Sequence, residues 1–231
     1  MDWLTDEYYL SKLHFSQLKE LLQFYLSDIY EHFGFTDYTT EAYENELLSL
    51  LNEDKSFYDL SIYYVIRKRN TREIFGAIRI TYWDRKTILP IEKLFNINLK
   101  EALPKRSNLW HIGRFVITKH LPINRISFFK KLLYNAFYPV HRFGEGLVIA
   151  ECDKKVITTL QKLGIKSNIL GESIEYICSE TFPIYIESGA LNPFILANSQ
   201  RYFSNNNISD VNWFSKIITC HNQKMVSSNY I

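Results

Sequence analysis

Residues 119–125 read KHLPINR and join a segment typical of a strand to one typical of an amphipathic helix. Three of them, Lys119, His120 and Arg125, can carry positive charge. Where a strand leads into a helix, the first backbone N–H groups lack intrahelical partners and the helix dipole is positive. Such a joint can hold a phosphate group without a glycine-rich loop. The alternative interpretation is an ordinary solvated loop that carries cations.

The preceding strand, in the run LWHIGRFVI, carries two further side chains that could take part in catalysis or binding. An imidazole can accept a proton near neutral pH, which makes His111 a candidate general base. Arg114 requires an anionic partner if it is buried. On a regular strand these two side chains point to opposite faces, so a bulge or twist near Gly113 is required for both to act at one site. The alternative for His111 is a buried structural histidine.

The elements that must position these groups can be predicted from hydrophobic periodicity and turn residues. Helices are expected where apolar residues recur every three or four positions, and strands where Ile, Val and Tyr cluster. The chain is expected to contain helices over 16–33 and 40–51, a hairpin over 61–83, a strand over 109–118, a helix over 126–138, a buried strand over 146–152, a helix over 154–164, and two strands within 173–187 broken at Pro183.

This order of elements predicts an α/β fold. Strand–helix–strand units imply parallel neighbours, whereas the hairpin is antiparallel. We expect one central mixed sheet of about six to seven strands with helices on both faces. Residues 1–187 would form the domain, and the Asn- and Ser-rich residues 188–231 a partly ordered C-terminal appendage whose Phe194, Trp213 and Phe214 could dock on it.

Composition excludes several classes of protein. The 231 residues are 46% hydrophobic and 16% aromatic, which suffices for a core, and a net charge of +2 argues against a nucleic-acid partner. The acidic N-terminus does not resemble a secretory signal, and no apolar run predicts a transmembrane segment, so a cytoplasmic location is expected. Cys152, Cys178 and Cys220 lack metal-ligand spacing, which favours reduced, buried thiols and no metal site.

Four short motifs, in this order and spacing, resemble the GNAT acyltransferase superfamily. They are Asp59 in FYDLSIYYVI, Gly76 and Arg79 in GAIRI, the run LPIEKLF at 89–95, and WHIGRFVI at 110–117. Within the superfamily they are similar to the branch of acyl-homoserine lactone synthases and long-chain N-acyl amino acid synthases. The resemblance covers about residues 16–187.

The resemblance implies direct transfer of an acyl group from a phosphopantetheine thioester, carried by coenzyme A or an acyl carrier protein, to the amine of a small molecule such as an amino acid. His111 would be the catalytic base. The pantetheine arm would pair with a strand edge, and the basic joint would hold the phosphate. The site residues implied are Asp59, Arg79 and Arg114 for the amine substrate, and Phe115, Val116, Ile117, Lys119 and Arg125 for the donor.

Two features leave alternatives open. The family's strand glutamate is replaced by His111 and the serine before the arginine by Gly113, and histidine supplies no negative charge for Arg79 or Arg114. The alternatives are therefore an acetyl-CoA-dependent N-acetyltransferase and a catalytically silent GNAT-like ligand-binding protein. The arginines could equally form a structural ion cluster with Asp59 or Glu92.

The acyl carrier protein remains a candidate partner because basic residues gather near the helix start. Lys119, Arg125, Lys130 and Lys131 could attract an acidic carrier, and such attraction would be salt-sensitive. The alternative is a solvated basic face.

Overall fold

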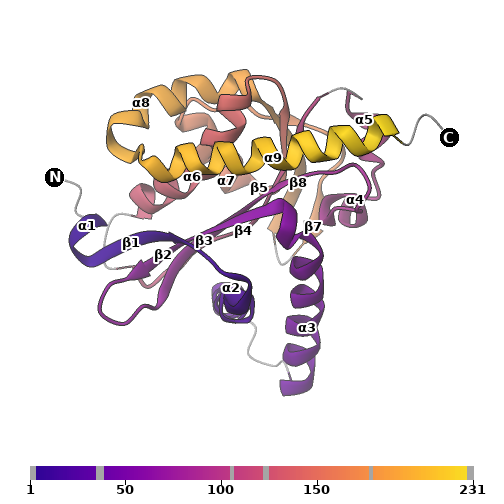
Figure 1. The fold of residues 1–231 in the computed structure, drawn as a ribbon. Helices are drawn as coiled ribbons and strands as arrows, with labels where there is room; N and C mark the ends of the chain where they lie inside the picture. The colour runs from indigo at the N-terminus through magenta and orange to yellow at the C-terminus, as the bar shows by residue number, and fades with distance from the viewer. Residues whose placement is uncertain (1–3, 35–38, 105–106, 122–124, 177–178, 228–231) are drawn as a thin grey trace. The chain divides into compact units, whose positions relative to one another are not determined.

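The computed structural model describes residues 4–34, 39–104, 107–121, 125–176 and 179–227. The chain divides into two compact units, and strand β4 (Leu109–Ile117) and helix α6 (Arg125–Phe143) contribute to both. The first unit comprises Met1–Thr81, Ile112–Ala136 and Tyr176–Ser179, and the second comprises Tyr82–His111, Phe137–Glu175 and Glu180–Ile231. Figure 1 labels the elements along the chain.

The first unit contains the hairpin that the sequence predicts. Its strands lie in the order β1-β2-β3-β4, and β1 with β2 and β2 with β3 pair antiparallel, so that Tyr63 lies opposite Arg79. Its elements, besides parts of β4 and α6, are α1 (Leu4–Glu7), β1 (Tyr8–Lys12), η1 (Phe15–Gln17), α2 (Leu18–Phe33), α3 (Thr40–Phe57), η2 (Tyr58–Leu60), β2 (Ser61–Lys68) and β3 (Ile74–Tyr82).

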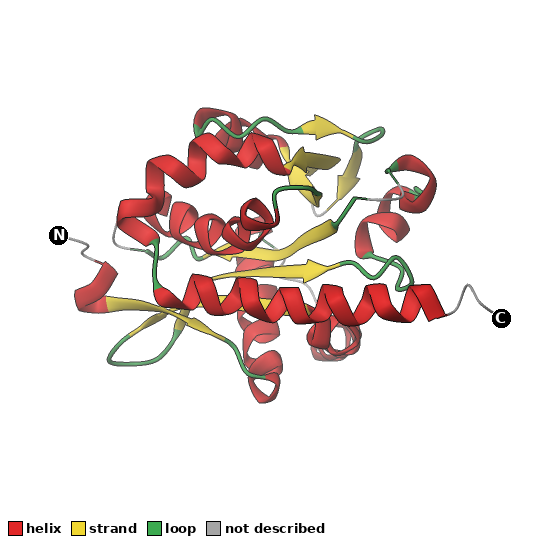
Figure 2. Ribbon diagram, turned by 45° about the horizontal axis from the view of Figure 1, so that its top comes forward, coloured by secondary structure: helices red, strands yellow, loops and turns green. Residues whose placement is uncertain are grey.

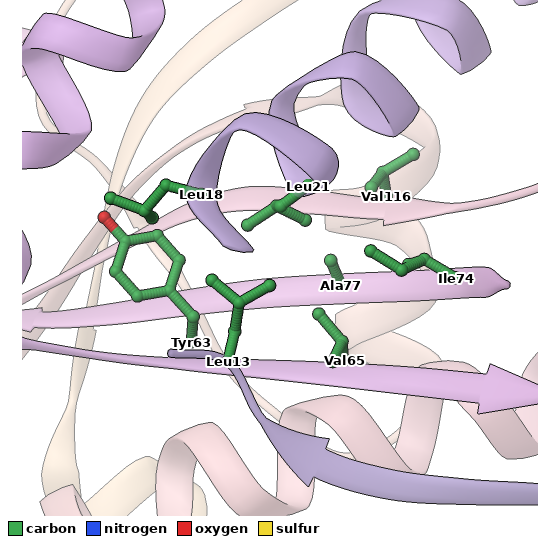
Figure 3. Close-up of a cluster of buried hydrophobic side chains, with 8 residues drawn as sticks. All are labelled: Leu13, Leu18, Leu21, Tyr63, Val65, Ile74, Ala77 and Val116. Atoms are coloured by element: carbon green, nitrogen blue, oxygen red, sulfur yellow. The ribbon is translucent and has the colours of Figure 1, made fainter. Parts of the chain in front are cut away.

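Helices cover both faces of the strands in this unit. On one face, Leu18 and Leu21 of α2 pack against Val65, Ala77 and other buried residues of β2, β3 and β4 (Figure 3). On the other face, a Cβ atom at Gly76 would lie 3.2 Å from the Leu132 side chain of α6, so the helix approaches the strand closely there. Neighbouring strand residues point to opposite faces, so Gly76 and Ala77 of β3 face different helices: Gly76 faces α6 and Ala77 faces α2.

The second unit contains the strand order β4-β5-β8-β6, with β7 beside β8. Strand β8 pairs antiparallel with β5 and with β6, and Glu151 lies opposite Pro183. Its elements, besides parts of β4 and α6, are α4 (Pro90–Phe95), α5 (Leu99–Ala102), β5 (Leu147–Asp153), α7 (Lys154–Lys162), β6 (Asn168–Ile169), β7 (Ile174–Tyr176), β8 (Ser179–Glu187), η3 (Ser188–Leu191), α8 (Asn192–Tyr202) and α9 (Asn205–Ser227).

Helices α8 and α9 follow β8 along the chain (Figure 1, Figure 2). The ring of Phe214 on α9 packs edge-on against Trp110 of β4, with ring centroids 4.7 Å apart, and Phe194 on α8 packs against Phe137 at 6.5 Å. Both phenylalanines are buried. The residues after Glu187 thus add helices and aromatic side chains to the core of the second unit.

The α/β class with a mixed sheet is confirmed, with eight strands in the described residues rather than six or seven. Three sequence predictions were wrong in detail. The helix expected over 40–51 continues to Phe57 in α3, and the helix expected over 126–138 continues to Phe143 in α6. Pro183 does not separate two strands but lies inside β8, where its carbonyl accepts from Leu170 N at 2.8 Å. Strand β1 was not anticipated.

Within the described ranges, no helix combines the length and apolar character that a membrane crossing requires.

Candidate functional site

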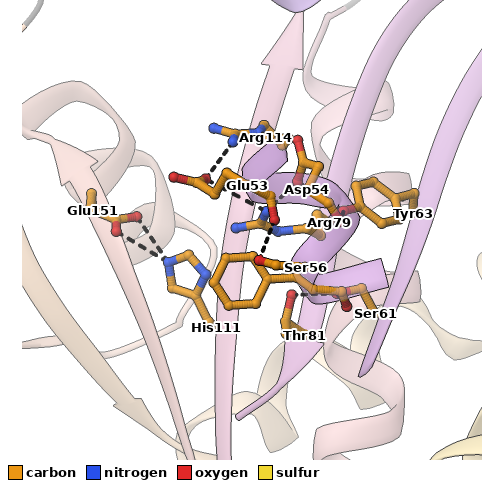
Figure 4. Close-up of polar contacts among 11 residues, drawn as sticks. Glu53, Asp54, Ser56, Ser61, Tyr63, Arg79, Thr81, His111, Arg114 and Glu151 are labelled. Atoms are coloured by element: carbon orange, nitrogen blue, oxygen red, sulfur yellow. Dashed lines mark hydrogen bonds and ion pairs between the residues drawn. The ribbon is translucent and has the colours of Figure 1, made fainter. Parts of the chain in front are cut away.

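A buried ion cluster occupies the first unit, between the end of α3 and strands β3 and β4 (Figure 4). The Asp54 carboxylate lies between two guanidinium groups: Arg79 donates to Oδ1 and Arg114 Nε donates to Oδ2 at 2.8 Å. Tyr63 donates its hydroxyl to Asp54 Oδ1 at 2.8 Å, and Arg114 Nη2 bonds Glu53 Oε1 at 2.5 Å. Two carboxylates therefore neutralise two guanidinium groups.

In this cluster, the attraction between opposite charges changes the pKa values more than burial does. Burial by itself would raise the pKa of Asp54, but the charges of Arg79 and Arg114 hold its pKa below the ordinary value. Burial would likewise lower the pKa of Arg114, yet the nearby Asp54 carboxylate raises it. The side chain of Asp54 is 0% exposed and that of Glu53 24%, so solvent reaches the cluster at Glu53.

The backbone of β4 is irregular where it joins this cluster. Arg114 has a φ of 52°, a left-handed conformation that a non-glycine residue adopts at a cost of about 1–3 kcal/mol. The break in strand alternation expected near Gly113 is therefore present, at Arg114. It allows the guanidinium to reach Asp54 while its ring neighbour, Tyr25, lies 5.3 Å beneath it.

Gly113 leaves room for the Arg79 side chain. A Cβ atom at this position would lie 2.7 Å from Arg79 Nη2, and Arg79 cannot swing aside because Asp54 holds its guanidinium. We therefore expect Gly113→Ala to lower the free energy of unfolding by about 1–3 kcal/mol. Urea unfolding measures this, with Gly189→Ala as the control because a Cβ there meets no atom within 4 Å. An unchanged midpoint in Gly113→Ala would contradict the close contact.

A second polar pair lies in the second unit, where β4 faces β5. His111 Nε2 is 3.2 Å from Oε1 and 3.1 Å from Oε2 of Glu151 (Figure 4). The His111 side chain is 1% exposed, whereas that of Glu151 is 17% exposed. A carboxylate bonded to one imidazole nitrogen orients the ring, and the imidazole and the carboxylate are both groups that can accept a proton.

The basic joint makes contacts within the chain. Lys119 Nζ lies 3.2 Å from Glu31 Oε1 of α2, and His120 Nε2 lies 2.7 Å from the same oxygen. Hydrogen bonds from His120 and Lys119 lower the pKa of Glu31. Arg125 donates to the Ile117 carbonyl at 2.7 Å. The remainder of the predicted joint, residues 122–124, lies outside the described residues.

The predicted donor strand, Phe115 to Ile117, has a defined orientation in the first unit. Thr118 N donates to Phe75 O of β3 at 3.1 Å. Because the backbone groups of successive strand residues point to opposite sides, those of Ile117 point away from β3. Val116 and Ile117 bury their side chains, and the Phe115 ring packs edge-on against Phe129 at 4.9 Å.

The sequence predicted the wrong carboxylates as partners of the two arginines. Arg79 and Arg114 come together, but their carboxylates are Asp54 and Glu53, whereas Asp59 is exposed in η2. Glu92, the other expected partner, instead caps its own helix by accepting from Leu89 N at 2.9 Å.

Glu151 was also missed, although a signal for it exists. It is a single carboxylate in the continuous apolar run GLVIAEC, where an acidic side chain requires a partner. The end of α3 offered a weaker signal, because Glu53 and Asp54 lie beyond the last apolar residue that the helical pattern included.

The thiol of Cys152 is buried beside Glu151 in β5, and burial raises its pKa, which disfavours a nucleophilic role. Cys178 and the side chain of Cys220 lie outside the described residues. In the described part of the chain, no three His, Cys, Asp or Glu side chains gather in a way that could hold a metal ion.

No protein-family model and no curated protein matches this sequence. Solved structures do resemble it. FeeM, an N-acyl amino acid synthase from uncultured soil microbes, is 11% identical with a TM-score of 0.56, over 83% of this chain and 97% of FeeM. TofI, in a ternary complex with an inhibitor and MTA, is 13% identical with a TM-score of 0.52, over 81% of this chain and 96% of TofI.

At this identity the likenesses establish the fold alone. One of the similar structures is an N-acyl amino acid synthase, a type of protein in the branch that the sequence motifs resemble. The chain has the GNAT-like fold that those motifs implied.

Proposed function

We propose that this protein is an N-acyltransferase that moves an acyl group directly from a phosphopantetheine thioester to the amine of a small molecule. The observation that carries the proposal is the buried His111–Glu151 pair on the β4 and β5 strands of a GNAT-like fold. It supplies a proton acceptor where the resemblance calls for one, although the family's glutamate is absent from position 111. An amino acid is the first candidate for the amine.

The reaction requires alignment and removal of a proton. A thioester carbonyl is already reactive, so the amine nitrogen can attack it once it is held close and deprotonated. The C–N bond forms, the C–S bond breaks, and the departing sulfur takes a proton to become a thiol. The proton lost by the amine passes to the His111–Glu151 pair.

The donor is proposed to lie along β4. The backbone groups of Ile117 point away from β3. Its carbonyl accepts from Arg125 at 2.7 Å, so an amide chain such as pantetheine could pair there with the N–H of Ile117. In this proposal Phe115, Val116 and Ile117 hold the arm, and Lys119 and Arg125 hold the phosphate. Glu31 neutralises Lys119 in the structure, so an arriving phosphate would exchange one anion for another.

Replacing both Lys119 and Arg125 with alanine is expected to weaken dodecanoyl-CoA binding roughly 10-fold, since a charge-assisted contact contributes about 1.5–3 kcal/mol when buried and less at this exposure. Calorimetry measures the affinity. Glu31→Gln should strengthen binding a few-fold at low salt because it removes the competing anion. Unchanged affinity in both variants would remove these cations from the donor site.

A direct assay identifies the amine substrate and the acyl donor. The purified protein is incubated with dodecanoyl-CoA or dodecanoyl-acyl carrier protein and mixed amino acids, and the products are identified by mass spectrometry. An N-dodecanoyl amino acid supports the proposal. Turnover of acetyl-CoA but not of dodecanoyl donors would indicate an N-acetyltransferase, and donor binding without turnover would indicate a silent binding protein.

A further inference from the structure

The two members of the His111–Glu151 pair differ in what can reach them. His111 is 1% exposed at its side chain and Glu151 is 17% exposed. Both carboxylate oxygens lie within 3.2 Å of one imidazole nitrogen, so His111 holds the whole carboxylate rather than a single oxygen. A molecule that approaches the pair therefore meets the carboxylate of Glu151 first, with the imidazole behind it.

The position of Glu151 in the chain requires an explanation. It interrupts the apolar run of β5, whose preceding residues from Leu147 to Ala150 are all buried. A carboxylate costs free energy in such a place unless it is paired. Apolar residues would serve a purely structural strand better, because a buried ion pair is often less stabilising than a well-packed apolar pair. A functional role accounts for the position.

We propose that Glu151 is the residue that contacts the substrate amine, so that the carboxylate absent from position 111 of β4 is supplied by β5. The inference rests on the proposed N-acyltransferase function and extends it to the chemistry of the acceptor. Glu151 selects a primary amine that arrives as a cationic ammonium group. His111 serves as the positioning partner of Glu151 and as part of the proton acceptor.

Each proton in the step is accounted for. The ammonium nitrogen donates to a Glu151 oxygen and loses one proton to the pair. The neutral nitrogen then bonds to the thioester carbon and the C–S bond breaks. The nitrogen gives up a second proton on becoming an amide, and the departing sulfur takes up one. The net products are an N-acyl amide, a thiol and one proton released to water.

The test separates binding of the amine from turnover. Glu151→Gln keeps the size of the side chain and its hydrogen bonds but removes the charge that attracts an ammonium group. Loss of a charge-assisted hydrogen bond should raise KM for the amine roughly 10- to 100-fold. The assay follows thiol release from dodecanoyl-CoA with the amino acid that supports the fastest rate. Glu187→Gln, at the exposed end of β8, is the matched control and should leave KM unchanged.

Exchange of the two side chains provides a second measurement. His111→Glu alone places two carboxylates side by side, and Glu151→His alone places two imidazoles there. The double variant His111→Glu/Glu151→His restores one of each, so its melting temperature should exceed those of the single variants. Its carboxylate lies at the buried position 111, so its KM for the amine should stay as high as that of Glu151→Gln. Recovery of this KM in the double variant would contradict contact between the amine and the carboxylate at position 151.

The outcomes separate this inference from the proposed function. If the unmodified protein releases no thiol from dodecanoyl-CoA or dodecanoyl-acyl carrier protein with any small-molecule amine, the proposed function fails. If it is active and Glu151→Gln keeps the KM for the amine, with or without a lower melting temperature, the acyltransferase stands and Glu151 does not contact the amine. A preference for neutral hydroxylamines over ammonium substrates in the unmodified protein would overturn the inference as well.

Discussion

Asp54→Asn is expected to lower the free energy of unfolding by about 3–5 kcal/mol, the usual cost of removing one partner from a buried charge cluster. The substitution keeps the shape of the side chain and one acceptor oxygen. It removes the charge that Arg79 and Arg114 share, and leaves the partly exposed Glu53 as the carboxylate that faces both buried guanidinium groups among the described ion pairs. Urea unfolding followed by circular dichroism measures the loss.

The matched control for this substitution is Glu44→Gln, on the exposed face of the same helix, α3. A surface change of this kind alters stability by no more than about 0.5 kcal/mol. If Asp54→Asn behaved like this control, the arginines would be held by something other than the carboxylate between them. The same result would reopen the hypothesis that they bind the carboxylate of a substrate.

The lowered pKa of Asp54 determines how its contribution to stability changes with pH. Its folded-state pKa lies below the unfolded value of about 3.9, so the carboxylate binds fewer protons in the folded state. The contribution is fully present above the unfolded pKa and is lost as pH falls through the folded one. The difference in unfolding free energy between the unmodified protein and Asp54→Asn should be constant above about pH 5 and shrink in acid. A difference that grew on acidification would contradict this sign.

The geometry favours a structural role for Arg79 over recognition of substrate. Its guanidinium is buried, bonded to Asp54 and stacked over the Phe57 ring at 5.1 Å. A substrate carboxylate would have to displace Asp54 to reach it. Glu53 and the edge of Arg114 are the accessible part of the cluster, so any direct contact with a substrate is expected there.

Strong periodicity made much of the fold predictable from sequence. The hairpin was foreseen because two runs of β-branched and aromatic residues flank a charged turn, and α2 because its apolar residues recur on one face and end at Gly34, whose φ is 68°. The helices after Glu187 were not foreseen. Their Asn and Ser residues are poor helix formers, and tertiary burial of Phe194 and Phe214 overrides that propensity.

The candidate site was predictable only in part, because its partners come from distant segments. The arginines and His111 could be named since charged groups are conspicuous in apolar strands. Their carboxylates could not be assigned, because α3 continues beyond Leu51, where the predicted helix ends, and because the sequence of one strand does not show which residues of another strand it faces. His111→Glu, which restores the residue type that the family carries there, would place a second carboxylate beside Glu151 and should not raise activity.

His111→Gln is expected to reduce kcat by about 100- to 10,000-fold, the range in which general acid–base groups contribute. Glutamine fills much of the same space and can still donate a hydrogen bond to Glu151, so the carboxylate remains in place for the amine. It cannot become protonated, and the pair loses the group that shares the proton with Glu151. KM for the amine should therefore change little, the reverse of the effect expected for Glu151→Gln.

Single-turnover measurement with dodecanoyl-CoA isolates this chemical step from product release. The matched control is His141→Gln on α6, whose imidazole bonds Asn192 at 2.7 Å and carries no role in the proposal. Melting temperature reports whether the loss reflects unfolding, because His111 is buried and its replacement can also disturb packing. If His111→Gln turns over at the unmodified rate, Glu151 or water takes the proton alone and the histidine only holds the carboxylate. If kcat and melting temperature fall together and Glu151→Gln does the same without a change in KM, the pair is a structural contact between β4 and β5.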